Sequence, residues 1–147
     1  MPSPDHSPIQ LAKALSGDEA VEVNTGNGMF SSLVFKTIAD PYAGKLTLFR
    51  VYSGSVKPDT SVFNANHDAE ERVGQLFTLQ GKKQVPLSEI IAGDMGTVAK
   101  LKVTTTGDTL TTKSKGVQFD PIVFPNPVLA RAMVPKSRRT RKKSVTL

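Results

Sequence analysis

The sequence predicts an all-β domain, either an antiparallel barrel or a sandwich. From Phe30 onward, short apolar runs follow one another at intervals of about ten residues, which is the spacing of strands joined by turns. The chain contains 11 Gly and 10 Pro, residues that favour turns. No segment between Phe30 and Pro135 has the apolar spacing of a helix of about ten residues. At 147 residues, the chain is long enough for one sizeable core and too short for two.

Residues 1–29 are predicted to form a flexible lead-in, because Ser, Pro, Gly, Asp and Asn dominate them. Their one periodic segment, Ile9–Leu15, has the spacing of about two helical turns, which are too few to be stable alone in water. The start lacks the basic and apolar regions of a signal peptide, and no stretch approaches the roughly 18 apolar residues of a membrane span. We therefore expect a cytoplasmic protein with no membrane contact.

The strands are expected in the apolar runs between the turn signals. Leu33–Ile38 is the first, and Leu46–Tyr52 is the second. The second alternates at period two, so Arg50 and Val51 point to opposite faces. Later strands are expected at Ser61–Asn64, Arg72–Leu79, Thr97–Leu101 (after Ile90–Asp94), Thr109–Leu110, Ile122–Phe124 and Val128–Ala130. Alternation and strand placement give the core candidates Leu33, Phe35, Leu48, Val51, Val73, Leu76, Val98, Leu101 and Leu110.

Basic residues are concentrated at the C-terminal end. Six of the 19 Lys and Arg residues lie at positions 136–147, and the other thirteen equal the 13 Asp and Glu residues in number. The excess positive charge therefore belongs to the tail, and the body has no net charge. Residues 138–147 are predicted to be a disordered basic tail, because a run of like charges without apolar periodicity does not fold alone.

The sequence offers no catalytic, cofactor or metal site. It lacks the phosphate-binding pattern GxxxxGK[ST] and the nucleophile pattern GxSxG. The absence of cysteine excludes disulfides, thiolate zinc sites and cysteine nucleophiles. His6 and His67 are far apart, and each lies in a polar segment with no second ligand nearby. Glu70 and Glu71 are adjacent, and neighbouring side chains of an extended chain point apart, which does not suit a paired acid and base.

Phe35–Gly54 reads FKTIADPYAGKLTLFRVYSG and closely resembles the opening of the second domain of bacterial elongation factor G. Further stretches follow in the family's order: Glu71–Gly74, Ala92–Gly96, Thr106–Leu110, Phe124–Val128 and Pro135–Ser137, the last two toward a third domain. The resemblance implies a closed antiparallel six-stranded Greek-key β-barrel of the translation-factor domain II type. It places this barrel at residues 30–137, between the lead-in and the tail.

Two features differ from the main translocase of this family. Leu76–Gln84 is more similar to the elongation-factor-G-like paralogues, so translocase and paralogue both stay open. After Ser137 the family continues into an acidic helical domain, whereas here a basic run follows. The chain is therefore expected to be a domain excised from a longer protein, in which the GTPase domain precedes it.

The resemblance implies a non-catalytic module of a ribosomal GTPase. Such a barrel packs on the GTPase domain, adjoins the third domain and contacts small-subunit ribosomal RNA, while GTP and Mg²⁺ belong to the parent protein. We accordingly expect a monomer that is not itself an enzyme and holds no cofactor. The alternatives are a free-standing barrel that binds RNA through its basic tail, and a protein-interaction barrel.

Basic residues near turns are the candidates for RNA contact, because the family's exposed loops approach ribosomal RNA. They are Lys45, Lys57, Arg72, Lys82 and Lys83. Arg50 shares a face with Leu48 and Tyr52, so it is instead a candidate for pairing with a carboxylate at the domain interface. The contacts would be to phosphates, since a neutral body with few aromatic residues has little means of reading bases.

Overall fold

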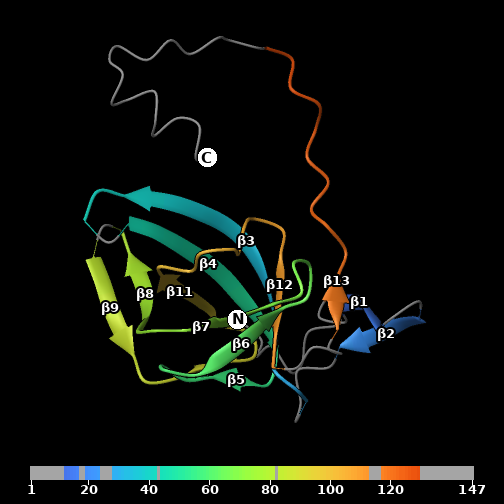
Figure 1. Ribbon diagram of the computed structural model, residues 1–147, viewed down its shortest axis with the longest axis horizontal. Coiled ribbons are helices and arrows are strands. Elements are labelled where there is room, and N and C mark those ends of the chain that lie inside the picture. The colour runs from blue at the N-terminus through green and yellow to red at the C-terminus, as the bar shows by residue number, and fades with distance from the viewer. Residues whose placement is uncertain are drawn as a thin grey trace.

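The computed structural model describes residues 12–16, 19–23, 28–42, 44–81, 83–112 and 117–129. Every strand pair in this part of the chain is antiparallel, and no described residue is helical, which confirms the all-β prediction. The strands are strongly curved (Figure 1), and most of the buried hydrophobic residues form one cluster. The predicted tail at 138–147 lies outside the described residues, as does Lys82.

Eight strands form the main sheet, in the order β7-β6-β12-β3-β4-β11-β8-β9. Their bounds are β3 (Ser31–Asp40), β4 (Gly44–Ser53), β6 (Ser61–Asn64), β7 (Ala69–Arg72), β8 (Leu76–Gln80), β9 (Lys83–Leu87), β11 (Met95–Ala99) and β12 (Thr109–Thr111). A two-stranded ribbon pairs β5 (Ser55–Val56) with β10 (Ile90–Ile91). The long hairpin of β3 and β4 lies at the centre of the order, so both flanks of the sheet are built on it.

The core lies on one face of the β3–β4 hairpin. Phe49 and Val51 point inward from β4, and Val34 points inward from β3. The core predictions for Val51, Val73, Leu76, Val98, Leu101 and Leu110 are confirmed, because all six belong to the buried cluster.

Three core predictions are wrong: Leu33, Phe35 and Leu48 are only partly buried. Leu48 lies three positions before Val51, and residues an odd number apart point to opposite faces of a regular strand. In β3 the register shifts between Val34 and Lys36, so Phe35 lies at an irregularity where simple alternation does not apply. Leu33 packs outside the main core, against Phe119.

Gly54 allows the chain to pass from β4 into β5 close to the start of β3. Its φ is +66°, and a Cβ atom there would lie 2.8 Å from the backbone nitrogen of Phe30. Only glycine combines a left-handed backbone with so close an approach of another segment.

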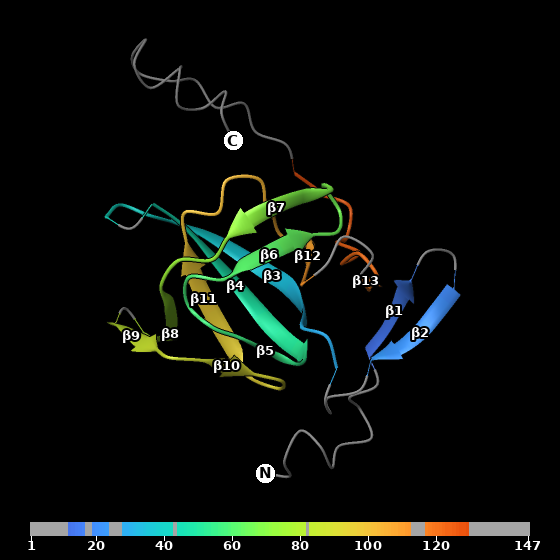
Figure 2. The same cartoon turned by 60° about the horizontal axis from the view of Figure 1, so that its bottom comes forward.

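A three-stranded sheet joins the two ends of the described chain. It pairs β1 (Ala12–Ser16) with β2 (Glu19–Val23) and with β13 (Gln118–Phe119), beside the main sheet (Figure 2). The helical interpretation of Ile9–Leu15 is therefore wrong in its described part. Two helical turns have little stability by themselves, whereas a strand here gains backbone partners on both sides.

The segment after β13 contains no strand among its described residues, 120–129. The strands expected at Ile122–Phe124 and from Val128 onward are therefore wrong as far as the structure describes them. Pro121, Pro125 and Pro127 lack the N–H groups that a sheet requires. Within the described residues, no helix is long and apolar enough to cross a membrane.

Candidate nucleic-acid interface

Lys45 ties the start of β4 to the segment that follows β11. Its side chain is half-buried, and its ammonium group donates to the carbonyl oxygen of Thr104. The backbone nitrogen of Lys100 donates to the carbonyl oxygen of Lys45 at 3.0 Å. Residues 100–104, here called the 100–104 loop, are thus fastened to β4 at both ends.

Glu71 holds the middle of this loop from the other side. The residue is 8% exposed. One of its carboxylate oxygens accepts the N–H groups of Lys102 and Val103, the latter at 2.9 Å. The other accepts the N–H of Thr104 at 3.0 Å and the Thr104 hydroxyl. One buried carboxylate therefore satisfies three consecutive backbone donors that would otherwise be unpaired.

The same contacts set the ionisation of Glu71. Burial raises the pKa of its carboxyl group, but the hydrogen bonds from Thr104, Val103 and Lys102 lower it by more. The net effect is a pKa below the ordinary value of 4.5. Glu71 is therefore a carboxylate at neutral pH, and it acts as a structural anion rather than a proton donor.

A buried polar network continues from Thr104 toward β6. The Asn64 amide donates to the Thr104 hydroxyl at 3.1 Å and to Oδ2 of Asp108 at 2.9 Å. Oδ2 of Asp108 also accepts the N–H of Thr105 at 2.7 Å, and Nε2 of His67 lies 3.2 Å from it. The network orders the chain between β11 and β12. No group of three or more His, Cys, Asp or Glu residues that could hold a metal ion occurs among the described residues.

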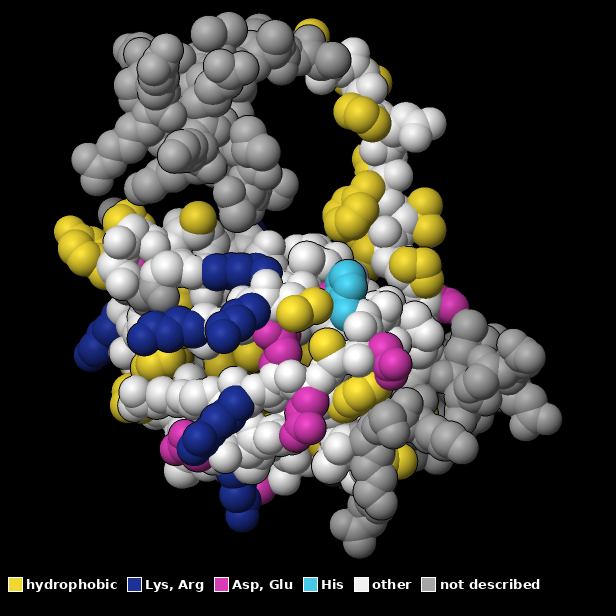
Figure 3. Space-filling model, in the orientation of Figure 1, with side chains coloured by type: hydrophobic (Ala, Val, Ile, Leu, Met, Phe, Trp, Pro, Cys, Tyr) yellow, Lys and Arg dark blue, Asp and Glu magenta, His cyan; other side chains and the backbone are white. Residues whose placement is uncertain are grey.

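Two lysines of the ordered loop, Lys100 and Lys102, are exposed. Lys100 has a φ of +67°, a backbone that non-glycine residues rarely adopt. The loop also contacts Lys45 and Glu71. Several Lys and Arg side chains lie side by side on the face turned to the viewer in Figure 3.

The other predicted RNA-contact residues are dispersed. Arg72 is exposed, and its Nη2 lies 3.3 Å from Oδ1 of Asp59, with each side chain 73% exposed. Lys57 is exposed in the connection between β5 and β6, and Lys83 is exposed at the start of β9. Of the predicted RNA-contact residues, Lys45 is hydrogen-bonded to the 100–104 loop. Among the described residues, no hydrogen bond or ion pair joins Arg72, Lys57 or Lys83 to this loop.

Sequence reasoning did not select Lys100 and Lys102. The signal was present, because both lysines precede the turn motif at Thr106–Asp108. What the sequence does not display is the contact with Glu71, a residue about thirty positions away.

The family model for elongation factor G domain 2 matches residues 29–113. The chain belongs to the elongation factor G domain 2 family. It is a translation-factor β domain, and this domain is non-catalytic. The matched residues run from just before β3 to just after β12, so they include the main sheet, Glu71 and the 100–104 loop.

A solved structure agrees with this membership. The chain is similar to a protein from Thermus thermophilus whose crystal structure gives a TM-score of 0.65 at 27% identity. The match covers 82% of this chain and 18% of that chain. This chain therefore spans less than a fifth of the length of that protein.

In this elongation factor G domain 2, Arg50 lies on the face of β4 opposite to the core. Its guanidinium carbon is 5.6 Å from the centre of the Tyr52 ring, and that ring is 4.9 Å from the Phe119 ring. Arg50 also pairs with Met95 across the β4–β11 ladder. A guanidinium over an aromatic ring is attracted to the ring without being neutralised.

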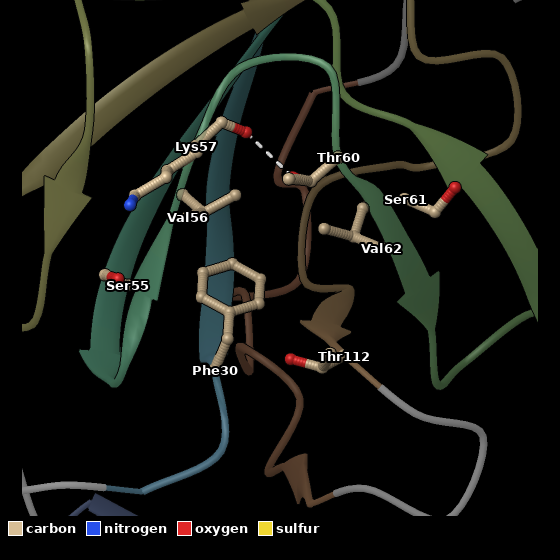
Figure 4. Close-up of a pocket in the computed structure, with 8 residues that line it drawn as sticks. All are labelled: Phe30, Ser55, Val56, Lys57, Thr60, Ser61, Val62 and Thr112. Carbon is tan, nitrogen blue, oxygen red and sulfur yellow. Dashed lines mark hydrogen bonds between the residues drawn. The ribbon is translucent and has the colours of Figure 1, made fainter.

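A pocket of about 190 Å³ opens between the β5–β6 connection and the end of β12 (Figure 4). Phe30, Val56 and Val62 are its buried lining, and Lys57 is among its exposed residues. Ligand pockets commonly have volumes of about 300 Å³ or more. The size therefore suits one side chain of a partner better than a cofactor.

Proposed function

We propose that this chain is the non-catalytic β domain of a ribosomal GTPase of the elongation factor G or G-like type. In this proposal the domain packs on the GTPase domain of its parent and contacts small-subunit ribosomal RNA in the cytoplasm. The observation that carries it is the family match over residues 29–113. In this proposal, GTP is hydrolysed by the GTPase domain of a longer parent protein.

The lysines of the 100–104 loop, together with Lys45, support contact with an RNA backbone. Lysine side chains provide point charges that bind phosphates without reading sequence. A body with no net charge gains affinity for a polyanion only where its cations are concentrated on one face. Lys100 and Lys102 lie two positions apart on one loop, and Lys45 is hydrogen-bonded to both ends of that loop.

Three exposed apolar side chains support packing on another domain. Met29, Ile91 and Met95 are 47%, 56% and 61% exposed. The N–H of Ala92, next to Ile91, donates to the carbonyl oxygen of Gly54, which itself lies against the start of β3. Large apolar side chains that stay exposed, as these three do, are common on surfaces that contact another protein unit. Arg50 lies beside Met95 and offers a cation to a carboxylate of that unit.

Co-sedimentation with purified bacterial ribosomal subunits tests the proposal. We expect the chain to pellet with small subunits and to a smaller extent with large subunits. A variant that stops at Ser137 is the control for the basic tail, and it should keep the preference for small subunits. Equal pelleting with both subunits, or binding that disappears with the tail, would contradict the proposal and favour a free-standing RNA-binding barrel.

A further inference from the structure

We propose that the 100–104 loop is a binding site for RNA phosphodiesters, that Lys100 and Lys102 bind the phosphates, and that Glu71 is their positioning residue. This inference rests on the proposed function, because it takes RNA as the partner. It goes further in naming one loop, two cations and the buried carboxylate that orders them.

The loop is built in advance of any ligand. The carbonyl oxygen of Lys45 accepts the N–H of Lys100, and the ammonium group of Lys45 donates to the carbonyl oxygen of Thr104. Between these two contacts, the Glu71 carboxylate accepts the N–H groups of Lys102, Val103 and Thr104. A segment of this length without strand structure otherwise loses backbone freedom when it binds. Ordering by Glu71 removes that cost from the binding step.

The charges of the two lysines are available to a ligand. Neither ammonium group forms an ion pair with a carboxylate of the described residues, whereas Arg72 pairs with Asp59. The carboxylate of Glu71, which accepts the backbone N–H of Lys102, is buried and surrounded by four donors. A phosphate that approaches from solvent therefore meets two unpaired cations on a fixed backbone.

The ligand class follows from what this loop provides. Lys102, Val103 and Thr104 supply no aromatic ring on which a base could stack. Their backbone N–H groups are occupied by Glu71, so they are not donors to a base edge. The site therefore binds the sugar-phosphate backbone and not the sequence.

The first test neutralises the two lysines in the full chain. The probes are purified bacterial small ribosomal subunits and a labelled single-stranded RNA of mixed sequence. Each lost phosphate contact removes about 0.7–0.9 from the slope of log affinity against log salt, so the Lys100→Gln/Lys102→Gln variant should bind roughly 20-fold more weakly at physiological salt. The slope should fall by about 1.5.

A matched variant separates position from net charge. Lys36→Gln/Lys83→Gln removes the same charge from exposed positions on β3 and β9. It should change affinity by no more than about threefold. If both double variants weaken binding equally, the site assignment is wrong, although the proposed function survives. If the unmodified chain binds neither probe, the proposed function fails and the inference fails with it.

The second test of the role of Glu71 asks whether RNA affinity rises or falls when this residue loses its charge. Glu71→Gln and the neighbouring Glu70→Gln both remove one negative charge, and Glu70 is exposed. If only net charge mattered, both variants would bind RNA more tightly. We expect Glu70→Gln to bind equally or more tightly and Glu71→Gln to bind about tenfold more weakly, because the loop is no longer held.

Amide hydrogen exchange supplies the accompanying readout. In Glu71→Gln, exchange at Lys102, Val103 and Thr104 should accelerate, while the amides of β4 and β11 stay protected. Tighter RNA binding by a folded Glu71→Gln variant would overturn the positioning role. The lysine variants change exposed residues only, so their result stands even if Glu71→Gln does not fold.

Discussion

Replacing Glu71 by glutamine should destabilise the domain by an amount that the hydrogen bonds define. The glutamine amide retains one acceptor oxygen, whereas the carboxylate serves two pairs of donors. If that oxygen stays with Lys102 and Val103, the amide group faces Thr104, whose hydroxyl can turn to accept but whose N–H is left unpaired. Thr104 is fully buried, and an unpaired buried donor costs about 1–3 kcal/mol. The lost charge assistance to the other bonds brings the expected decrease in the free energy of unfolding to about 2–4 kcal/mol.

The pH dependence provides an independent check on the cause. The pKa of Glu71 is lower in the folded chain than its ordinary value of 4.5. Its stabilising contribution is therefore complete above the unfolded-state pKa and is lost as pH falls through the folded-state pKa. Glutamine does not titrate. The difference in the free energy of unfolding between the unmodified chain and Glu71→Gln should therefore be constant near neutral pH and should narrow below about pH 4.5.

Urea unfolding followed by circular dichroism measures the decrease in the free energy of unfolding and its dependence on pH, with Glu70→Gln as the control. The exposed Glu70 should change stability by no more than about 0.5 kcal/mol. The anchoring role would be refuted if Glu71→Gln changed the free energy of unfolding by as little as Glu70→Gln. It would also be refuted if the stability difference between Glu71→Gln and the unmodified chain widened as pH falls.

Three further predictions concern backbone, core and ligand. Gly54→Ala should destabilise the domain by more than Gly44→Ala. Both glycines have a positive φ, which costs another residue about 1–2 kcal/mol, but only Gly54 lies against another backbone segment. Equal decreases in thermal stability for the two variants would contradict this. Leu76→Ala should cost about 2–5 kcal/mol of unfolding free energy, and Leu48→Ala should cost clearly less, since only Leu76 belongs to the buried cluster. Calorimetry should detect no GTP binding at roughly micromolar strength, because the sequence has no phosphate-binding loop with its lysine and metal-binding hydroxyl.

The sequence predicts the fold class and most of the core because both follow from local patterns. Alternation in β4 correctly places Val51 and Arg50 on opposite faces. The same alternation in β7 places Glu70 and Glu71 on opposite sides, and the structure shows Glu70 exposed and Glu71 buried. The errors occur where the period breaks. Phe35 lies at the register shift in β3, which alternation does not reveal.

The candidate site was predicted less completely because it depends on contacts between distant residues. The sequence predicts Lys45 as a basic residue near a turn, and the structure shows it hydrogen-bonded to the 100–104 loop. Lys100 and Lys102 gain their importance from Glu71, which appears in the sequence as an ordinary strand acid. Likewise, β1 pairs with β13 across about a hundred residues, so no local pattern distinguishes that strand from a short helix.

Lysine footprinting on the ribosome tests the central claim most directly. The chain is treated with an amine-reactive reagent, alone and with bacterial small ribosomal subunits, and the labelled positions are identified by mass spectrometry. We predict that Lys100 and Lys102 lose labelling in the complex, while Lys36 and Lys83 remain labelled. The account would be contradicted if the chain binds the subunit and Lys100 and Lys102 are labelled as strongly as in the free protein.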